Sequence, residues 1–212
     1  MKEQLQKDFD NIIKNLSLSQ RDTEIKQFYL DNFINKGFPN RRDENWKFSD
    51  LNQIIKKNIG ELSFYNDYTS TNKVDTSVFV DGLEHNKIVF INGRIEKIDF
   101  DYEKKDQIEI IDKSETINKF NNNNSLSDLN NAFTNKSFKI LVKNGYQLEK
   151  PLIIYHITNS DIWSKNINLR LDFELSKDSS LRLIDLYNDT SEKNFLNIFY
   201  NFDLKENAVL KN

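Results

Sequence analysis

The sequence contains no cysteine and very little glycine, proline or alanine. Of its 212 residues, none is Cys, five are Gly, two are Pro and two are Ala. Without Cys, the chain has no disulfide bond, thiolate metal site, cysteine nucleophile or cysteine-held iron-sulfur cluster of its own. Zinc would have only His85 and His156 as nitrogen ligands. The few Gly and Pro residues leave few positions for tight reversing turns.

The chain also lacks an excess of charge of either sign and any long apolar run. Lys and Arg number 30 against 33 Asp and Glu, which gives a net charge of -3 and a pI near 5.6. This balance disfavours binding to nucleic acid or to an anionic membrane surface. The N-terminal residues MKEQLQKDFDNIIKNL alternate charges where a signal peptide would have an apolar segment. We therefore expect a soluble, cytoplasmic protein with no nucleic-acid or membrane partner.

Asparagine and aromatic residues are abundant instead. The chain has 30 Asn, 16 Phe and 8 Tyr. Such Asn richness is typical of an A+T-rich coding sequence and by itself indicates no function. The apolar residues are 37% of the chain and recur periodically, which predicts a folded core rather than a disordered tract.

The first sixty residues predict three helices. Apolar residues at helical spacing mark a helix at 3–16 and a second helix after it. In the second helix, Ser17 and Gln20 have the spacing of a capping box, and Gly37 and Pro39 are the stop signal. Ser49 or Asp50 would cap a third, short helix that ends at Gly60.

Beyond a polar stretch at 66–76, the apolar period changes from 3.6 to 2. Residues 87–91 and 94–98 flank Asn92-Gly93, which predicts a β-hairpin. A strand near 108–111, a loop at 121–124 and a short helix at 125–133 follow. The remaining chain predicts six strands, at 138–142, 152–157, 167–175, 181–187, 195–204 and 208–211. Periodicity alone leaves open whether these strands form a solenoid or a sandwich, and the uncapped last strand makes the chain look unfinished.

The stretch from Gly37 to Phe48 resembles a known signature. It reads Gly-Phe-Pro-Asn-Arg-Arg-Asp-Glu-Asn-Trp-Lys-Phe and is similar to Gly-x-Pro-x-Arg-x-x-Glu-x-Trp-Lys-Tyr of SufD-like chains, in the SufB/SufD family of iron-sulfur cluster assembly proteins. Weaker matches follow in the same order at 89–94, 129–133, 149–154 and 206–211. The matching signature residues are Gly37, Pro39, Arg41, Glu44, Trp46 and Lys47, whereas Phe48 stands where the family usually has Tyr.

The resemblance implies a fold and a function. The fold would be α+β and mainly β, with an N-terminal helical region at 1–60, a connecting β-hairpin segment at 61–124 and, at 125–212, the first coils of a right-handed parallel β-helix, truncated at its C-terminal end. The function would be that of a non-enzymatic scaffold subunit of the SUF system, in the N-terminal half of the protein. Its partners would be SufB-like and SufC-like (ATPase) subunits, contacted mostly beyond residue 212. No catalytic residue, cofactor or metal site is expected in this segment.

Two features near the signature have alternative interpretations. Trp46 is either a functional aromatic or, as we favour, an anchor that docks the helical region onto the rest of the chain. The charged residues from Arg41 to Lys47 form either an anion site or docking patch, or local ion pairs that fix the turn. We favour the ion pairs.

The candidate chemical groups are few. His85 and His156 each stand alone, which predicts structural or solvated side chains. Asp172 and Glu174 lie two residues apart and so on one face of a strand, as in a carbohydrate-active β-helix enzyme, although charged residues on an outer face explain them more simply. No hydrolase, nucleotide-binding or zinc-protease motif occurs. A scaffold is therefore the first prediction and the carbohydrate-active enzyme the alternative.

Overall fold

The computed structural model of the chain describes residues 2–16, 18–64, 76–113, 124–159, 162–189 and 193–212. Residues 66–75 of the predicted polar stretch and 121–123 of the predicted loop lie outside these ranges. The helices described are α1 (Lys2–Asn15), α2 (Gln20–Lys36), α3 (Leu51–Asn58) and α4 (Ser125–Phe133), with the 3-10 turns η1 (Glu44–Trp46) and η2 (Thr76–Val78).

The predicted helices are confirmed, and side-chain caps define where they begin. The hydroxyl of Ser19 accepts the backbone N–H of Asp22 at 3.1 Å, so α2 begins after Ser19 and not after the predicted Ser17. Gly37 ends α2 with a φ of 74°, a left-handed conformation that a residue without Cβ adopts freely. At α3 the carboxylate of Asp50 accepts the N–H of Gln53 at 3.0 Å. Ser19 and Asp50 each satisfy a backbone donor that the helix itself leaves unpaired, whereas the N–H of Gly37 donates to the Phe33 carbonyl.

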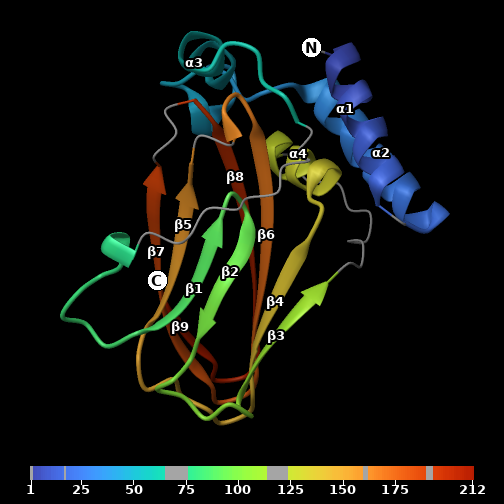
Figure 1. The fold of residues 1–212 in the computed structure, drawn as a ribbon. Coiled ribbons are helices and arrows are strands. Elements are labelled where there is room, and N and C mark those ends of the chain that lie inside the picture. The colour runs from blue at the N-terminus through green and yellow to red at the C-terminus, as the bar shows by residue number, and fades with distance from the viewer. Residues whose placement is uncertain (1, 17, 65–75, 114–123, 160–161, 190–192) are drawn as a thin grey trace.

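The strands form two sheets that face each other (Figure 1). The first has the order β2-β1-β5-β7-β9 and the second β3-β4-β6-β8. Their bounds are β1 Asn86–Ile91, β2 Arg94–Asp99, β3 Ile108–Lys113, β4 Ser137–Val142, β5 Leu152–Thr158, β6 Asn166–Leu175, β7 Ser180–Asp189, β8 Phe195–Leu204 and β9 Val209–Lys211. The predicted strand positions are thus confirmed to within two residues.

The predicted right-handed parallel β-helix is wrong, because both sheets mix parallel and antiparallel strands. In the first sheet β2 runs antiparallel to β1, and in the second β3 runs antiparallel to β4, whereas the other neighbouring pairs are parallel. The physical reason is that the β1–β2 turn reverses the chain directly, whereas a parallel solenoid advances in one direction. The architecture is α+β with two mixed sheets.

The hairpin turn between β1 and β2 was predicted from Asn92-Gly93 and is confirmed. Both residues have positive φ, 51° at Asn92 and 78° at Gly93, which is the backbone that a two-residue turn of this kind requires. A Cβ at residue 93 would lie 2.6 Å from Cγ2 of Ile167 on β6. Gly93 is therefore required both by the turn and by its close approach to β6.

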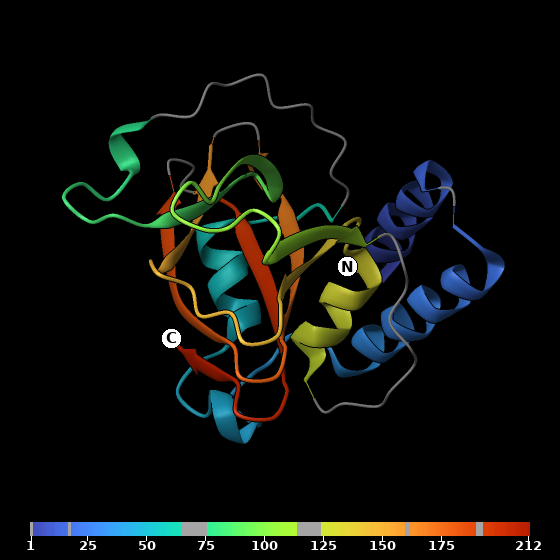
Figure 2. The same cartoon turned by 90° about the horizontal axis from the view of Figure 1, so that it is seen from below.

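Two main apolar cores hold these layers together. Between the sheets, inward side chains of alternate strand residues form one core, among them Phe90, Ile154 and Phe173. A second core joins α1, α2, α3 and α4 around Phe9, Phe33 and Phe133. Figures 1 and 2 show α1, α2 and α4 on one side of the strands and α3 at one end.

The helices are short or polar. In the described part of the chain, none combines the length and the apolar composition that crossing a bilayer requires.

Candidate functional site

The signature residues lie in one turn between α2 and α3. Backbone and side-chain bonds within the turn hold it: the N–H of Asn40 donates to the Asp43 carboxylate at 2.8 Å, and the N–H of Leu51 donates to the Pro39 carbonyl at 3.0 Å. Gly37 and Pro39 therefore shape the turn. Arg41, Glu44 and Lys47 are exposed on its surface.

The predicted ion pairs of this turn are not formed. None of the ion pairs found within the described ranges involves a residue from Arg41 to Lys47. The short carboxylate of Asp43 instead bonds to the backbone of the turn, which fixes the turn without a cation. The Lys47 ammonium lies 5.2 Å from the ring centre of Phe48, and that ring is 87% exposed.

Trp46 is half-buried and packs against the helical core. This placement supports the anchor interpretation. A docking role for the exposed residues beside it stays a prediction.

Asp172 and Glu174 both lie on the outer face of β6 and both have cationic partners. Arg170 binds Asp172 at 3.1 Å, and Lys139 on β4 pairs with Glu174. Both carboxylates are thus engaged by cations of the protein itself on the outer face of the sheet. The geometry therefore favours the structural interpretation of this pair over the carbohydrate-active enzyme.

His85 is a structural residue. It is 5% exposed, its Nδ1 lies 2.6 Å from the Leu83 carbonyl and its Nε2 lies 2.9 Å from the Tyr155 hydroxyl. The hydroxyl of Tyr155 also accepts the N–H of Val80 at 3.0 Å. These bonds fasten the segment before β1 to β5.

His156 belongs to a polar cluster between the two sheets. Its Nε2 lies 2.9 Å from the Tyr200 hydroxyl and 3.4 Å from Oδ1 of Asp185. The Tyr200 hydroxyl donates to Asp185 and is also hydrogen-bonded to Tyr187. We call these four side chains the inter-sheet cluster: His156 from β5, Asp185 and Tyr187 from β7, and Tyr200 from β8.

The surroundings of the inter-sheet cluster are aromatic and partly open. The His156 ring stacks between Phe90, at 5.5 Å between ring centres, and Tyr187, at 5.0 Å. His156 is 3% exposed, whereas Tyr187 is 61% exposed. Burial raises the pKa of the Tyr200 hydroxyl, and its hydrogen bond to Asp185 and the charge of Asp185 raise it further. Burial and the Asp185 charge likewise raise the pKa of Tyr187.

Beside the inter-sheet cluster, each of the two sheets has an edge strand, β9 in the first sheet and β8 in the second. β8 is the last strand of its sheet, and β9 pairs with only Ser180, Leu181 and Arg182 of β7. The N–H of Phe195 donates to the Lys165 carbonyl just before β6, and the N–H of Lys205 donates to the Leu175 carbonyl at the end of β6. The odd-numbered residues of β8 therefore direct their backbone groups toward β6. The residues between them direct backbone groups to the free edge: Leu196, Ile198, Tyr200, Phe202 and Leu204. We call β8, β9 and residues 183–189 of β7 the open edge.

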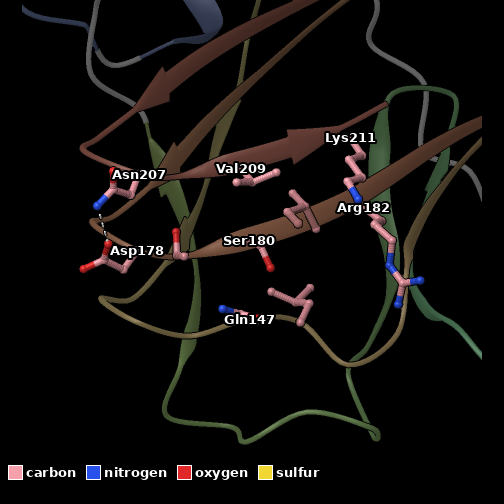
Figure 3. A pocket seen from close by; sticks show the side chains of 10 residues that line it. Gln147, Asp178, Ser180, Arg182, Asn207, Val209 and Lys211 are labelled. Carbon is pink, nitrogen blue, oxygen red and sulfur yellow. Dashed lines mark hydrogen bonds between the residues drawn. The ribbon is translucent and has the colours of Figure 1, made fainter.

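Apolar side chains are exposed along the open edge. Phe202 is 37% exposed and Leu204 46%, although both continue the inward series of β8. At the lower end of β7 and β9, a hollow of about 420 Å³ opens between Gln147, Ser180, Arg182, Val209 and Lys211 (Figure 3). Its lining includes the cationic Arg182 and Lys211 and one carboxylate, that of Asp178, which accepts a hydrogen bond from the Asn207 side-chain amide at 2.8 Å. We treat the hollow as a surface feature at the end of the open edge.

No protein-family model matches the chain, and no curated protein matches its sequence. In the described part of the chain, no group of three or more His, Cys, Asp or Glu side chains is placed to hold a metal ion.

The sequence reasoning missed the inter-sheet cluster, although a signal was present. On β7, Asp185 continues the alternating series of Leu181 and Leu183, which are both buried in the core between the sheets. A charged residue in such an inward series is a buried polar group that needs partners. The partners lie on other strands, and no local pattern indicates them.

Proposed function

We propose that the protein is a non-enzymatic scaffold subunit that works through protein-protein pairing at the open edge. The observation that carries the proposal is the combination on β8 of free backbone groups and exposed inward apolar residues such as Phe202 and Leu204. An edge strand with unpaired N–H and C=O groups is a template for a strand from another chain. Pairing would bury both the backbone groups and the apolar side chains.

The resemblance of the signature turn to the SufB/SufD family suggests which assembly the scaffold serves. On that basis we propose a cytoplasmic role in iron-sulfur cluster assembly, with a SufB-like subunit pairing at the open edge. A SufC-like ATPase would supply the energy of ATP, since the sequence has no nucleotide-binding motif of its own. The contribution of this chain is then surface and position, not chemistry.

The test is co-purification of the chain with the SufB-like and SufC-like subunits of the same genome. We expect the wild-type chain to retain the SufB-like subunit and to bind the SufC-like ATPase only when the SufB-like subunit is present. Phe202→Lys should abolish retention, because it places a charge inside the new pairing surface. Asn201→Lys is the matched control, since Asn201 directly precedes Phe202 on β8 and its side chain points to the outer face.

Two results would contradict the proposal. One is failure of the wild-type chain to retain the SufB-like subunit. The other is equal retention by Phe202→Lys and by Asn201→Lys, which would place the interface elsewhere. A separate result, stoichiometric capture of the SufC-like ATPase by the chain without the SufB-like subunit, would overturn only the assignment of the SufC-like contact.

A further inference from the structure

The inter-sheet cluster brings together four side chains whose polar atoms converge from three strands. Two donor atoms that bind one metal ion at about 2.0–2.2 Å, at octahedral or tetrahedral angles, lie about 2.9–3.5 Å apart. The distances from His156 Nε2 to Tyr200 Oη and to Asp185 Oδ1 are 2.9 Å and 3.4 Å. The Tyr200 hydroxyl and Oδ1 of Asp185 are in closer contact through a hydrogen bond, so these two oxygens would have to move apart to bind one ion. Side-chain rotations that break this hydrogen bond would admit an ion between the three atoms.

The carboxylate in this cluster has no fixed cation. Within the part of the chain that the structure describes, the ion pair of Asp185 is with His156 alone, and no Lys or Arg reaches it. Asp185 nevertheless lies on the inner face of β7, and its side chain is only 16% exposed. A carboxylate between two sheets is costly unless a cation or several hydrogen bonds compensate it. The site is electrostatically suited to receive a positive ion.

The donor set selects the kind of ion. One imidazole, one carboxylate and two phenol oxygens are mostly hard oxygen ligands without thiolate, which disfavours copper(I) and structural zinc sites. Imidazole is a common ligand of iron, and tyrosine oxygen binds iron in haem proteins. Both hydroxyls are protonated in the free chain, since their pKa values are raised. If a bound ion displaces the two phenol protons, two phenolates and one carboxylate carry three negative charges, which balance a trivalent cation.

We propose that the inter-sheet cluster is a binding site for a ferric ion. His156, Asp185 and Tyr200 bind from the interior, and the exposed Tyr187 completes the set and faces the solvent from which the ion enters. Binding releases the two phenol protons to solvent and involves no change of oxidation state. This site was not expected from the sequence, because two of its ligands are tyrosines and the four residues are spread over positions 156–200. It is independent of the function proposed above, which rests on other residues of the open edge.

The experiment adds ferric nitrilotriacetate to the purified, metal-stripped chain and records visible absorption. A ferric phenolate has a charge-transfer band that neither free tyrosine nor the chelate shows. We expect this band to saturate at one ferric ion per chain. Tyr187→Phe should weaken it, and Tyr200→Phe should weaken it with the aromatic stack of Tyr200 on Phe173 preserved. Tyr102→Phe is the matched control, since Tyr102 is an exposed tyrosine outside the cluster, and it should leave the band unchanged.

The design separates a site from unspecific binding and from misfolding. Far-UV circular dichroism of each variant checks the fold, and Tyr187→Phe changes a mostly exposed side chain, so it keeps the test valid if Tyr200→Phe unfolds the chain. Absence of the band in the wild-type chain overturns the proposal. A band of wild-type intensity in the Tyr187→Phe, Tyr200→Phe double variant overturns it as well, since the ion would then lie on other surface groups. Retention of SufB-like subunit has no bearing on either result.

Discussion

A single lysine, Lys26, joins α2 to the end of α4. Its ammonium is buried and donates to the carbonyls of Asn131, Ala132 and Thr134 at 3.2, 3.4 and 2.7 Å. These carbonyls are at the C-terminal end of α4, where a helix leaves them without intrahelical partners. Burial lowers the pKa of Lys26 to about 8, although the charge of Asp22 opposes the shift.

We predict that Lys26 makes stability rise with pH. Between the folded pKa of about 8 and the unfolded value of 10.5, the unfolded chain binds more protons than the folded chain, so the free energy of unfolding increases as pH rises. Urea unfolding between pH 7 and pH 10 should show a gain of about 2–3 kcal/mol in the wild-type chain relative to Lys26→Met. Lys14→Met, on the exposed side of α1, should track the wild type. A constant difference between the wild type and Lys26→Met would contradict this.

Glu103 is a second residue that fastens distant segments. It is 8% exposed and accepts hydrogen bonds from Asn86 and Tyr146, both at 2.7 Å, and from the backbone N–H groups of Lys150 and Glu149. Burial raises its pKa, but these hydrogen bonds outweigh burial, and the pKa lies below its ordinary value. The loop after β2 is thereby held against the start of β5.

Glu103→Gln should destabilise the chain by about 1–3 kcal/mol at pH 7, because an amide NH₂ replaces an oxygen that faces donors. The contribution of the Glu103 charge is complete above the ordinary glutamate pKa and is lost as pH falls through the lower folded pKa. Thermal unfolding at pH 7 and at pH 3 should therefore show a smaller difference between variant and wild type at pH 3. Glu149→Gln, an exposed neighbour, is the control. An equal difference at both pH values would show that the charge of Glu103 has no role.

At the scale of elements, asparagine side chains attach α4 to the outer face of the second sheet. Asn130 is fully buried and donates to the carbonyls of Leu169 on β6 and Asn197 on β8, at 3.0 and 2.8 Å. Asn197 donates in turn to the Leu126 carbonyl and to Asn168, both at 2.9 Å. The Asn richness, which from composition alone indicated nothing, thus includes a specific network.

We predict that this network discriminates between substitutions at Asn130. Asn130→Ala loses the bonds and should cost about 1–3 kcal/mol in the free energy of unfolding. Asn130→Asp should cost more, because a carboxylate would face the two carbonyls in place of their donor. Chemical unfolding of both variants measures this, with Asn135→Ala, at an exposed position after α4, as the control. If Asp were tolerated better than Ala, the hydrogen-bond assignment of Asn130 would be wrong.

At the scale of the whole molecule, the two edges of each sheet differ in strand direction and in residue composition. One side begins with the antiparallel strands β2 and β3, and the other ends at the open edge of β8 and β9. Polar and charged residues interrupt the outer strand β2, such as Arg94, Glu96 and Lys97, which protects it from pairing with another chain. Ile98 of β2 and Ile111 of β3 are exposed as well, but half or more of the residues of both strands are charged. On β8 the exposed Phe202 and Leu204 belong to a mostly apolar strand, and this difference is why the proposed pairing is assigned to one side only.

Local sequence patterns were enough to predict the helices, the end of the second helix at Gly37, the strand positions and the Asn92-Gly93 hairpin, and they left Ser49 and Asp50 as alternative caps of the third helix. These features depend on periodicity and on hydrogen bonds between residues at most a few positions apart, so a local pattern contains them. Three features emerge only in the folded chain: the mixed sheets, the ion pairs of Asp172 and Glu174, and the contact of His156 with Tyr200. Such pairings depend on the path of the chain between residues far apart in sequence, and side-chain alternation gives the face of a strand but not its neighbours.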